Sequence, residues 1–314
     1  MTVFLSTLNQ MAFLLLLIVI GYLLTRYGII PDYGAGLLSK LENYVFIPAL
    51  VLGTFMQNFT MERIHVAGSY LLCGLVVILL TMPLAVLFAR MCSKDPYIQN
   101  IYTYGLAFSN FGFMGNAVVA ALFPDVFMEY LIFVLPFWFF IYVWGVPSLL
   151  IPSDDQKKSL KSSLSNLVNP MFIAMMAGMI AGLSGLSLPS FFQSAVSSLG
   201  SCMSPIAMLL TGMTIARINL KETFQNGSIY VISMIRLLLS PGAAIVILSF
   251  LDLPYGLALC TVCSLAMPLG LNTIVVPSAY GRDTSVAAGM ALISHLFSCL
   301  TIPVIFALFH LLTV

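Results

Sequence analysis

The feature that most constrains this chain is a series of long apolar runs with almost no polar sequence between them. Hydrophobic residues make up 61% of the 314 positions and charged residues 7%, whereas a soluble globular domain has about a quarter charged residues. A helix of roughly 20 apolar residues crosses a hydrocarbon core of about 30 Å and satisfies its own backbone, while barrel strands alternate over about ten residues. The sequence therefore predicts an all-α integral membrane protein.

Apolar runs bounded by glycine, proline or charge are the predicted spans, and the loops between them are too short for a soluble domain. The longest polar stretch runs from Ser153 to Asn166 and is rich in lysine. We therefore divide the chain into five spans in residues 1–152, a cytoplasmic loop in residues 153–165 and five spans in residues 166–314. The ten runs lie near residues 4–25, 37–58, 66–90, 98–123, 126–150, 166–185, 199–216, 228–250, 254–279 and 285–311.

The basic residues indicate the orientation of these spans. Of the 12 lysines and arginines, all but Arg63 and Arg236 fall in alternate loops. Short cytoplasmic loops retain positive charge. We therefore predict a multi-pass protein of the plasma or inner membrane with both termini outside the cytoplasm.

The two halves of the chain enter the membrane with opposite orientations, because five spans precede the basic loop and five follow it. The fourth span is interrupted at Ser109–Asn116 and the ninth at Met267–Thr273, where glycine, proline and asparagine weaken or restart a helix. Paired interrupted spans point to a binding site at the membrane midplane. Two helix N-termini with free N–H groups would face each other there, which suits a carboxylate.

The predicted substrate-binding residues all lie at these two interruptions. For the asparagines, the competing interpretation is that they join helices or cap a break. The glycines serve close packing in most helices, and the proline shapes the break. The set is Asn110, Gly112, Gly115, Asn116, Pro268, Asn272 and Thr273.

Three further residues are candidates for anion attraction or coupling. Arg236 lies well inside the eighth span, where it could attract an anion or anchor the helix near the inner interface. It could also form a salt bridge, or bond backbone carbonyls where Pro241 loosens the same helix. His295 could carry a proton, although a single membrane histidine is more often only hydrogen-bonded. Glu42 could bind a proton or support the binding site. The simpler expectation is that water solvates it at the cytoplasmic interface.

The interrupted segments resemble the auxin efflux carrier family over nearly the whole chain. The matching stretches are Ser109 to Ala117, Arg236 to Pro241 and Pro268 to Asn272, together with Gly281, Asp283, Ser294, Ser298 and Pro303. The family contains plant auxin exporters and bacterial transporters of malate and related carboxylates. The resemblance implies ten helices in two inverted five-helix repeats, a scaffold and a transport domain with crossing helices 4 and 9, and alternating access.

Two positions depart from the family pattern. Ala117 occupies the place of a proline in the fourth span, and Asn116 precedes it. His295 stands where the family has a small polar residue. The first change bears on the shape of the crossover and the second on substrate or coupling.

The predicted function is a secondary active transporter for small organic anions, such as malate, other carboxylates or auxin-like acids. The rivals are a sodium-coupled symporter of the bile-acid type, a membrane metabolite sensor and a membrane enzyme. No P-loop, HExxH or GxSxG motif is present in the sequence, so we expect no enzyme and no cofactor. The scarcity of embedded acids favours protons or membrane potential over sodium as the driving force.

The expected partners are the lipid bilayer and the carboxylate substrate. With a net charge of +1 and no basic block, the chain gives no indication of a nucleic-acid partner. Cys260 and Cys263 lie one turn apart without a nearby histidine or acid, so no metal site is predicted. Gly178, Gly182 and Gly185 suggest a homodimer through the scaffold helices.

Overall fold

The computed structural model describes residues 2–31, 33–151, 170–185, 188–217 and 220–313. Within these residues every regular element is a helix, and the only β-type pairing is an isolated bridge between two residues. The predicted loop at residues 153–165 lies outside the described part of the chain. The all-helical prediction is confirmed.

Six helical segments of the described chain are long and apolar enough to cross a bilayer, and three shorter apolar helices accompany them. The multi-pass character is therefore confirmed, whereas ten spans in an inverted repeat remain a prediction. The six segments are Gly34–Asn58, Gly68–Cys92, Pro124–Leu150, Ser190–Ile215, Gly227–Ser249 and Ser285–Leu312. The shorter helices are Ala12–Arg26, Pro170–Ser184 and Tyr255–Ala266.

In the first half, two of these segments combine α-helix with π-helical turns. The elements before the first interruption are α1 (Thr2–Arg26), α2 (Gly34–Leu41), the π-helical η1 (Glu42–Phe46), α3 (Ile47–Asn58) and α4 (Met61–Cys92). Those after it are η3 (Pro124–Val126), α7 (Phe127–Phe133), α8 (Leu135–Phe140) and the π-helical η4 (Ile141–Leu150). Pro147 lies inside η4, where it removes a backbone donor.

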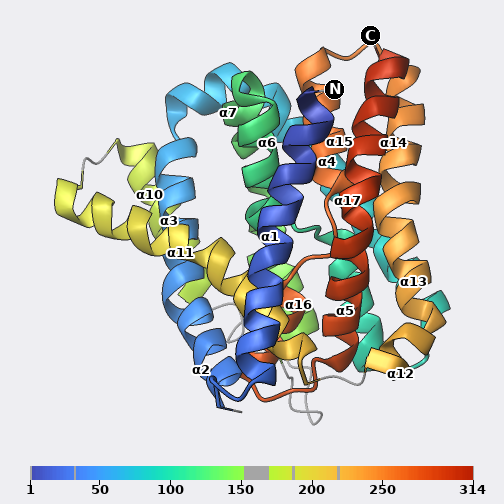
Figure 1. The fold of residues 1–314 in the computed structure, drawn as a ribbon. Coiled ribbons are helices and arrows are strands. Elements are labelled where there is room, and N and C mark those ends of the chain that lie inside the picture. Colours follow the sequence, from blue (N-terminus) through green and yellow to red (C-terminus); the bar gives the residue numbers. More distant parts are fainter. Residues whose placement is uncertain (1, 32, 152–169, 186–187, 218–219, 314) are drawn as a thin grey trace.

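The second half begins with two helices that contact α3. These are α10 (Pro170–Ser184) and α11 (Ser190–Ile215). Figure 1 shows α10 and the start of α11 beside α3, while the rest of α11 runs toward α1 in the middle of the molecule. The remaining elements outside the second interruption are α12 (Leu220–Gln225), α13 (Gly227–Met234), the π-helical η5 (Ile235–Leu239), α14 (Ser240–Ser249) and α17 (Ser285–Thr313).

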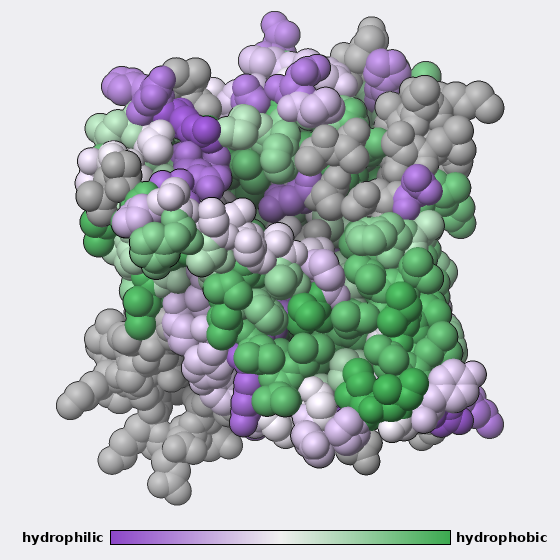
Figure 2. Space-filling model, turned by 60° about the vertical axis from the view of Figure 1, so that its left-hand side comes forward, coloured by the Kyte–Doolittle hydropathy of each residue, from purple (hydrophilic) through white to green (hydrophobic). Residues whose placement is uncertain are grey.

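The outer surface is apolar where a bilayer would contact it. On α4, Leu72 and Leu80 are each 62% exposed. Figure 2 shows a broad hydrophobic area on one face, with hydrophilic residues gathered toward its two ends. Exposed leucines at this density would be costly in water, so lipid is the solvent of this surface.

Glycines set the closest helix contacts. A Cβ added at Gly178 or Gly182 would lie within 3 Å of the carbonyl oxygen of Leu52 or Phe59, so α10 packs directly on the backbone of α3 and its end. Gly185 has a positive φ of 63° at the end of α10, a conformation that favours glycine. Gly178 and Gly182 therefore serve packing within the chain, and the homodimer through the scaffold helices stays a prediction.

The packing of α1 on α11 gives a first testable prediction. A Cβ at Gly212 would lie 1.9 Å from the carbonyl oxygen of Ile18, so alanine forces the two helices apart. Overpacking of this kind costs about 1–3 kcal/mol. We expect Gly212→Ala to lower the midpoint of thermal unfolding in detergent. Gly242→Ala is the control, because nothing lies within 4 Å of that position. Equal midpoints for the two variants would contradict this packing.

Candidate functional site at two helix breaks

The structure interrupts both segments at which the sequence predicted breaks. On the first side, α5 (Pro96–Ala107) ends, three residues leave the helix, and the π-helical η2 (Phe111–Gly115) leads into α6 (Asn116–Leu122). On the second side, α15 (Tyr255–Ala266) ends and α16 (Asn272–Ala279) begins after residues 267–271. The first break is shorter than predicted, because the helix restarts at Phe111.

The two breaks contact each other through their backbones. Ser109 and Leu269 form an isolated antiparallel bridge, and the N–H of Asn110 donates to the carbonyl oxygen of Pro268 over 2.8 Å. The Ser109 hydroxyl donates to the carbonyl oxygen of Ser264 over 2.6 Å. Backbone groups freed from a helix inside a membrane must find partners within the protein. Each break therefore provides hydrogen-bond partners for polar groups of the other.

The glycines at the crossover make room for neighbouring groups. A Cβ at Gly270 would lie 2.6 Å from the carbonyl oxygen of Phe108, so this glycine lets the two breaks approach. A Cβ at Gly112 would meet the ring of Trp138, and one at Gly115 would lie 2.4 Å from the hydroxyl of Tyr130. Gly112 and Gly115 thus pack against aromatic side chains and lie in η2, beyond the unwound residues.

Asn110 is buried and bonded to His295 of α17. Its Nδ2 lies 2.9 Å from Nε2 of His295, whose Nδ1 lies 2.8 Å from the carbonyl oxygen of Ala291. A carbonyl oxygen only accepts, so Nδ1 carries a hydrogen and Nε2 of the neutral ring accepts from Asn110. The Oδ1 of Asn110 is buried and has no partner within the described chain. The amide of Asn110 is therefore oriented by the protonation state of His295.

Asn272, like Asn110, has an amide with a bonded nitrogen and an unpaired oxygen. Its Nδ2 donates to the hydroxyl oxygen of Tyr104 over 2.8 Å, while its buried Oδ1 lacks a partner among the described residues. A tyrosine hydroxyl both donates and accepts. The amide of Asn272 can consequently turn over, keep its bond to Tyr104 and present N–H groups in place of the oxygen.

The first backbone groups of α16 are less free than the sequence suggested. The N–H of Thr273 lies 3.4 Å from the carbonyl oxygen of Gly270, and the N–H of Ile274 donates to the carbonyl oxygen of Leu271. The Thr273 hydroxyl also donates to Gly270. The expected free N–H donors are thus partly occupied, and the side-chain amides are the open polar groups.

Asn116 contributes a third unpaired oxygen at the start of α6. Its Oδ1 is buried without a partner in the described part of the chain. A buried polar atom without a hydrogen bond costs roughly 1–3 kcal/mol. Asn110, Asn116 and Asn272 thus each carry one buried side-chain oxygen that is open to a further hydrogen bond.

Arg236 holds the ends of both interrupted helices. It lies in η5, is fully buried, and donates to the carbonyl oxygens of Leu106, Ser264 and Met267 over 2.8–3.2 Å. These carbonyls belong to the C-terminal ends of α5 and α15, where cations are favourable. Arg236 thus bonds backbone carbonyls, as one alternative expected, but they lie on α5 and α15 at the crossover and not in its own helix near Pro241.

Glu42 lies away from the crossover, on η1. Its exposed fraction is 0%, so the expectation that the interface solvates it is wrong. The flanking Ser39 and Asn43 both donate to the carbonyl oxygen of Val275 in α16, over 2.5 and 3.1 Å. Glu42 is thus placed where α2 and η1 meet the second half of an interrupted helix.

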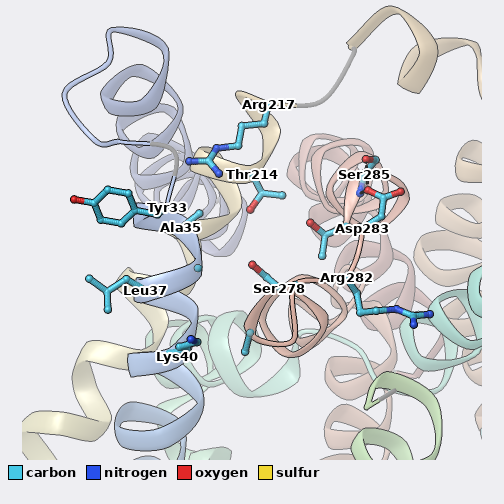
Figure 3. Close-up of a pocket in the computed structure, with 14 residues that line it drawn as sticks. Tyr33, Ala35, Leu37, Lys40, Thr214, Arg217, Ser278, Arg282, Asp283 and Ser285 are labelled. Carbon is cyan, nitrogen blue, oxygen red and sulfur yellow. Dashed lines mark hydrogen bonds between the residues drawn. The ribbon is translucent and has the colours of Figure 1, made fainter. Parts of the chain in front are cut away.

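A cavity of about 660 Å³ opens at the end of α16. It is bounded by α2, the end of α11, the end of α16 and the turn before α17 (Figure 3). Lys40 and Arg217 line it, while Arg282 turns away, with its guanidinium 4.7 Å from the ring centroid of Tyr97. The sequence placed these basic residues at one membrane face but gave no signal that they share a cavity. It also gave no signal that Tyr104 and Ser264 take part in hydrogen bonds at the crossover.

Comparisons with known proteins agree with a membrane carrier. A family described as "Membrane transport protein" matches residues 6–306. The chain is also similar to an uncharacterized transporter from Methanocaldococcus jannaschii, with 23% identity over 296 residues that cover 92% of this chain and 94% of the relative. The family match includes the two interrupted segments and the helices around them.

Proposed function

Because the chain belongs to the membrane transport protein family, also called the auxin efflux carrier family, we propose that it is a secondary active transporter for small organic anions. The substrate class is malate, other carboxylates or auxin-like acids. The protein works by alternating access in the cell membrane, with ten helices in two inverted repeats and both termini outside the cytoplasm. A relative described as a transporter supports the general activity.

The observation that carries the proposal is the pairing of two helix breaks beside asparagine amides whose nitrogen is hydrogen-bonded and whose oxygen is not. A carboxylate needs several N–H donors in a place from which bulk water is excluded. Asn272 supplies such N–H donors when its amide turns over, and it keeps a hydrogen bond to the hydroxyl of Tyr104. The N-terminal end of α16 adds a favourable dipole. Asn116, Thr273 and the backbone near Pro268 complete the binding site.

Asn110 links anion binding to His295. To present its N–H groups to an anion, the amide of Asn110 must turn its oxygen toward Nε2 of His295. That oxygen can accept only from a protonated Nε2, and Nδ1 already donates to Ala291. An anion at Asn110 therefore favours a charged imidazole, which in turn attracts the anion.

Access from one side runs through the cavity at the end of α16. Lys40 and Arg217 line its wall, and a basic wall raises the local concentration of anions. α16 connects this cavity to Asn272 at the crossover. The buried charge of Arg236 lies beside both breaks, so it adds to the positive potential without leaving its carbonyl partners.

A sodium-coupled symporter is the second candidate, and the unpaired oxygens favour it. As they stand, Oδ1 of Asn110, Asn116 and Asn272 are acceptors, which suit a cation as well as a water molecule. In that case sodium would occupy part of the crossover together with the substrate. A sodium gradient would then drive uptake.

The test is transport by purified protein in proteoliposomes. Uptake of labelled malate and a panel of carboxylates is measured under separately imposed pH, sodium and voltage gradients. Saturable uptake of a carboxylate supports the carrier, and the effective gradient identifies the coupling ion. Binding of a carboxylate without uptake under any gradient would contradict the carrier and favour a sensor. Chemical conversion of the substrate would indicate an enzyme.

A further inference from the structure

Glu42 is a buried carboxyl group that the anion site does not use. Its side chain is 0% exposed, and neither Oε1 nor Oε2 has a hydrogen-bond partner among the described residues. An ionised carboxylate in such a place would lose its hydration with no compensating charge. The neutral acid is the form that this environment tolerates.

The elements packed around η1 offer no counter-charge. They are α2, α3, α10, α11 and α16, and their titratable groups are Lys40 on α2 and Cys202 on α11, with Tyr44 on η1 itself. Lys40 is exposed and lines the cavity, and Tyr44 is 59% exposed. Cys202 donates to the carbonyl oxygen of Ser198. Glu42 therefore has no ion-pair partner on these elements.

From these observations we propose that Glu42 is a proton-binding site that couples proton movement to anion transport. The inference rests on the proposed function and deepens it by naming the coupling ion. In the conformation described here Glu42 holds its proton as a carboxylic acid. When the site is hydrated, the O–H bond breaks, the proton passes to water of the neighbouring cavity, and a carboxylate remains.

The contact with α16 links this proton to the crossover. Ser39 and Asn43 flank Glu42 and both bind the carbonyl oxygen of Val275, three residues after Asn272. A displacement of α16 during alternating access must break these two bonds. Water then reaches Glu42 from the side that α16 covered. Proton loss and movement of the anion site become one event.

A proton fits this place better than a metal cation. A sodium ion needs several oxygen ligands around it, whereas neither carboxyl oxygen of Glu42 has a hydrogen-bond partner in the described part of the chain to hold it as a ligand. The hydroxyl of Ser39 and the Nδ2 of Asn43 are both directed at the carbonyl oxygen of Val275. A single buried carboxyl group can bind a proton without any further ligand.

The experiment compares wild type, Glu42→Gln and Glu42→Asp in proteoliposomes, with Glu62→Gln as an exposed control. Two readouts are used, namely anion accumulation driven by a pH gradient and equilibrium exchange of labelled for unlabelled anion. One proton per anion allows at most about tenfold accumulation per pH unit. We expect Glu42→Gln to lose accumulation while keeping exchange, and Glu42→Asp to retain accumulation with a shifted pH dependence.

A second measurement does not depend on transport. Infrared difference spectroscopy of wild type against Glu42→Gln at neutral pH should show the C=O stretch of a protonated carboxylic acid in the wild type alone. Its absence would overturn the proposal, as would accumulation by Glu42→Gln equal to that of wild type. Uptake driven by sodium but not by a pH gradient would also overturn it. Absence of any anion flux with the infrared band present would contradict the proposed function and leave the proton site standing.

Discussion

Replacing Asn272 with alanine is expected to abolish most anion uptake while leaving the protein folded. The substitution removes the amide that bonds Tyr104 and that can present N–H groups to the substrate. A hydrogen bond to a charged group is worth about 1.5–3 kcal/mol, which corresponds to a loss of affinity of about ten- to a hundredfold. The measurement is the apparent KM and maximal rate of uptake at matched amounts of reconstituted protein.

The matched control is Asn58→Ala. Asn58 is also a buried asparagine, but it lies in α3 and bonds Thr54 and Arg63. This variant should show near wild-type uptake even if its thermal stability falls. Asn272→Asp adds a test of charge, because a carboxylate repels an anion and attracts a cation. Uptake kinetics unchanged in Asn272→Ala would contradict the crossover site, and stronger sodium dependence in Asn272→Asp would favour the sodium symporter.

The second large effect concerns Arg236, whose loss is expected to prevent stable folding. In Arg236→Met the carbonyl oxygens of Leu106, Ser264 and Met267 lose their donors inside the protein. Each unsatisfied buried group costs about 1–3 kcal/mol, against a total stability of about 5–15 kcal/mol. We expect a large fall in the yield of monodisperse protein and in the midpoint of thermal unfolding. Arg236→Lys should be intermediate, because one ammonium group cannot reproduce the geometry of the guanidinium.

Arg282→Met is the control for this prediction. It removes an exposed guanidinium that stacks on Tyr97 and supports no helix break. A small change in stability is expected. If Arg236→Met instead gave a stable protein with a raised KM for the anion, Arg236 would belong to the binding site and its carbonyl contacts would be secondary.

The sequence predicted the helical membrane protein because this property depends on composition and on the length of apolar runs. It also predicted where two helices break, since Asn110, Gly270 and Pro268 act locally on the backbone to which they belong. The family followed from the same residues. None of these inferences needs to know which segments touch.

The three-dimensional contacts changed several residue roles. Gly112 and Gly115 are explained by Trp138 and Tyr130, which lie on other helices and cannot be assigned from spacing. Glu42 was expected at the interface because Lys40 precedes it, yet the packing of neighbouring helices buries it completely. Burial depends on which helices pack over a residue, and the identity of one polar residue in the sequence does not reveal this packing.

Sequence alone therefore determined the solvent of this protein, its helical class, its two interruptions and its family. Only the tertiary structure decided that the interruptions pair through Ser109 and Leu269, that Arg236 bonds the ends of both, and that Glu42 is isolated. The physical reason is the separation along the chain of the groups that interact. Helix formation and breakage depend on hydrogen bonds within a few residues. These pairings join groups that are 28 or more positions apart, or depend on every helix that packs around a side chain.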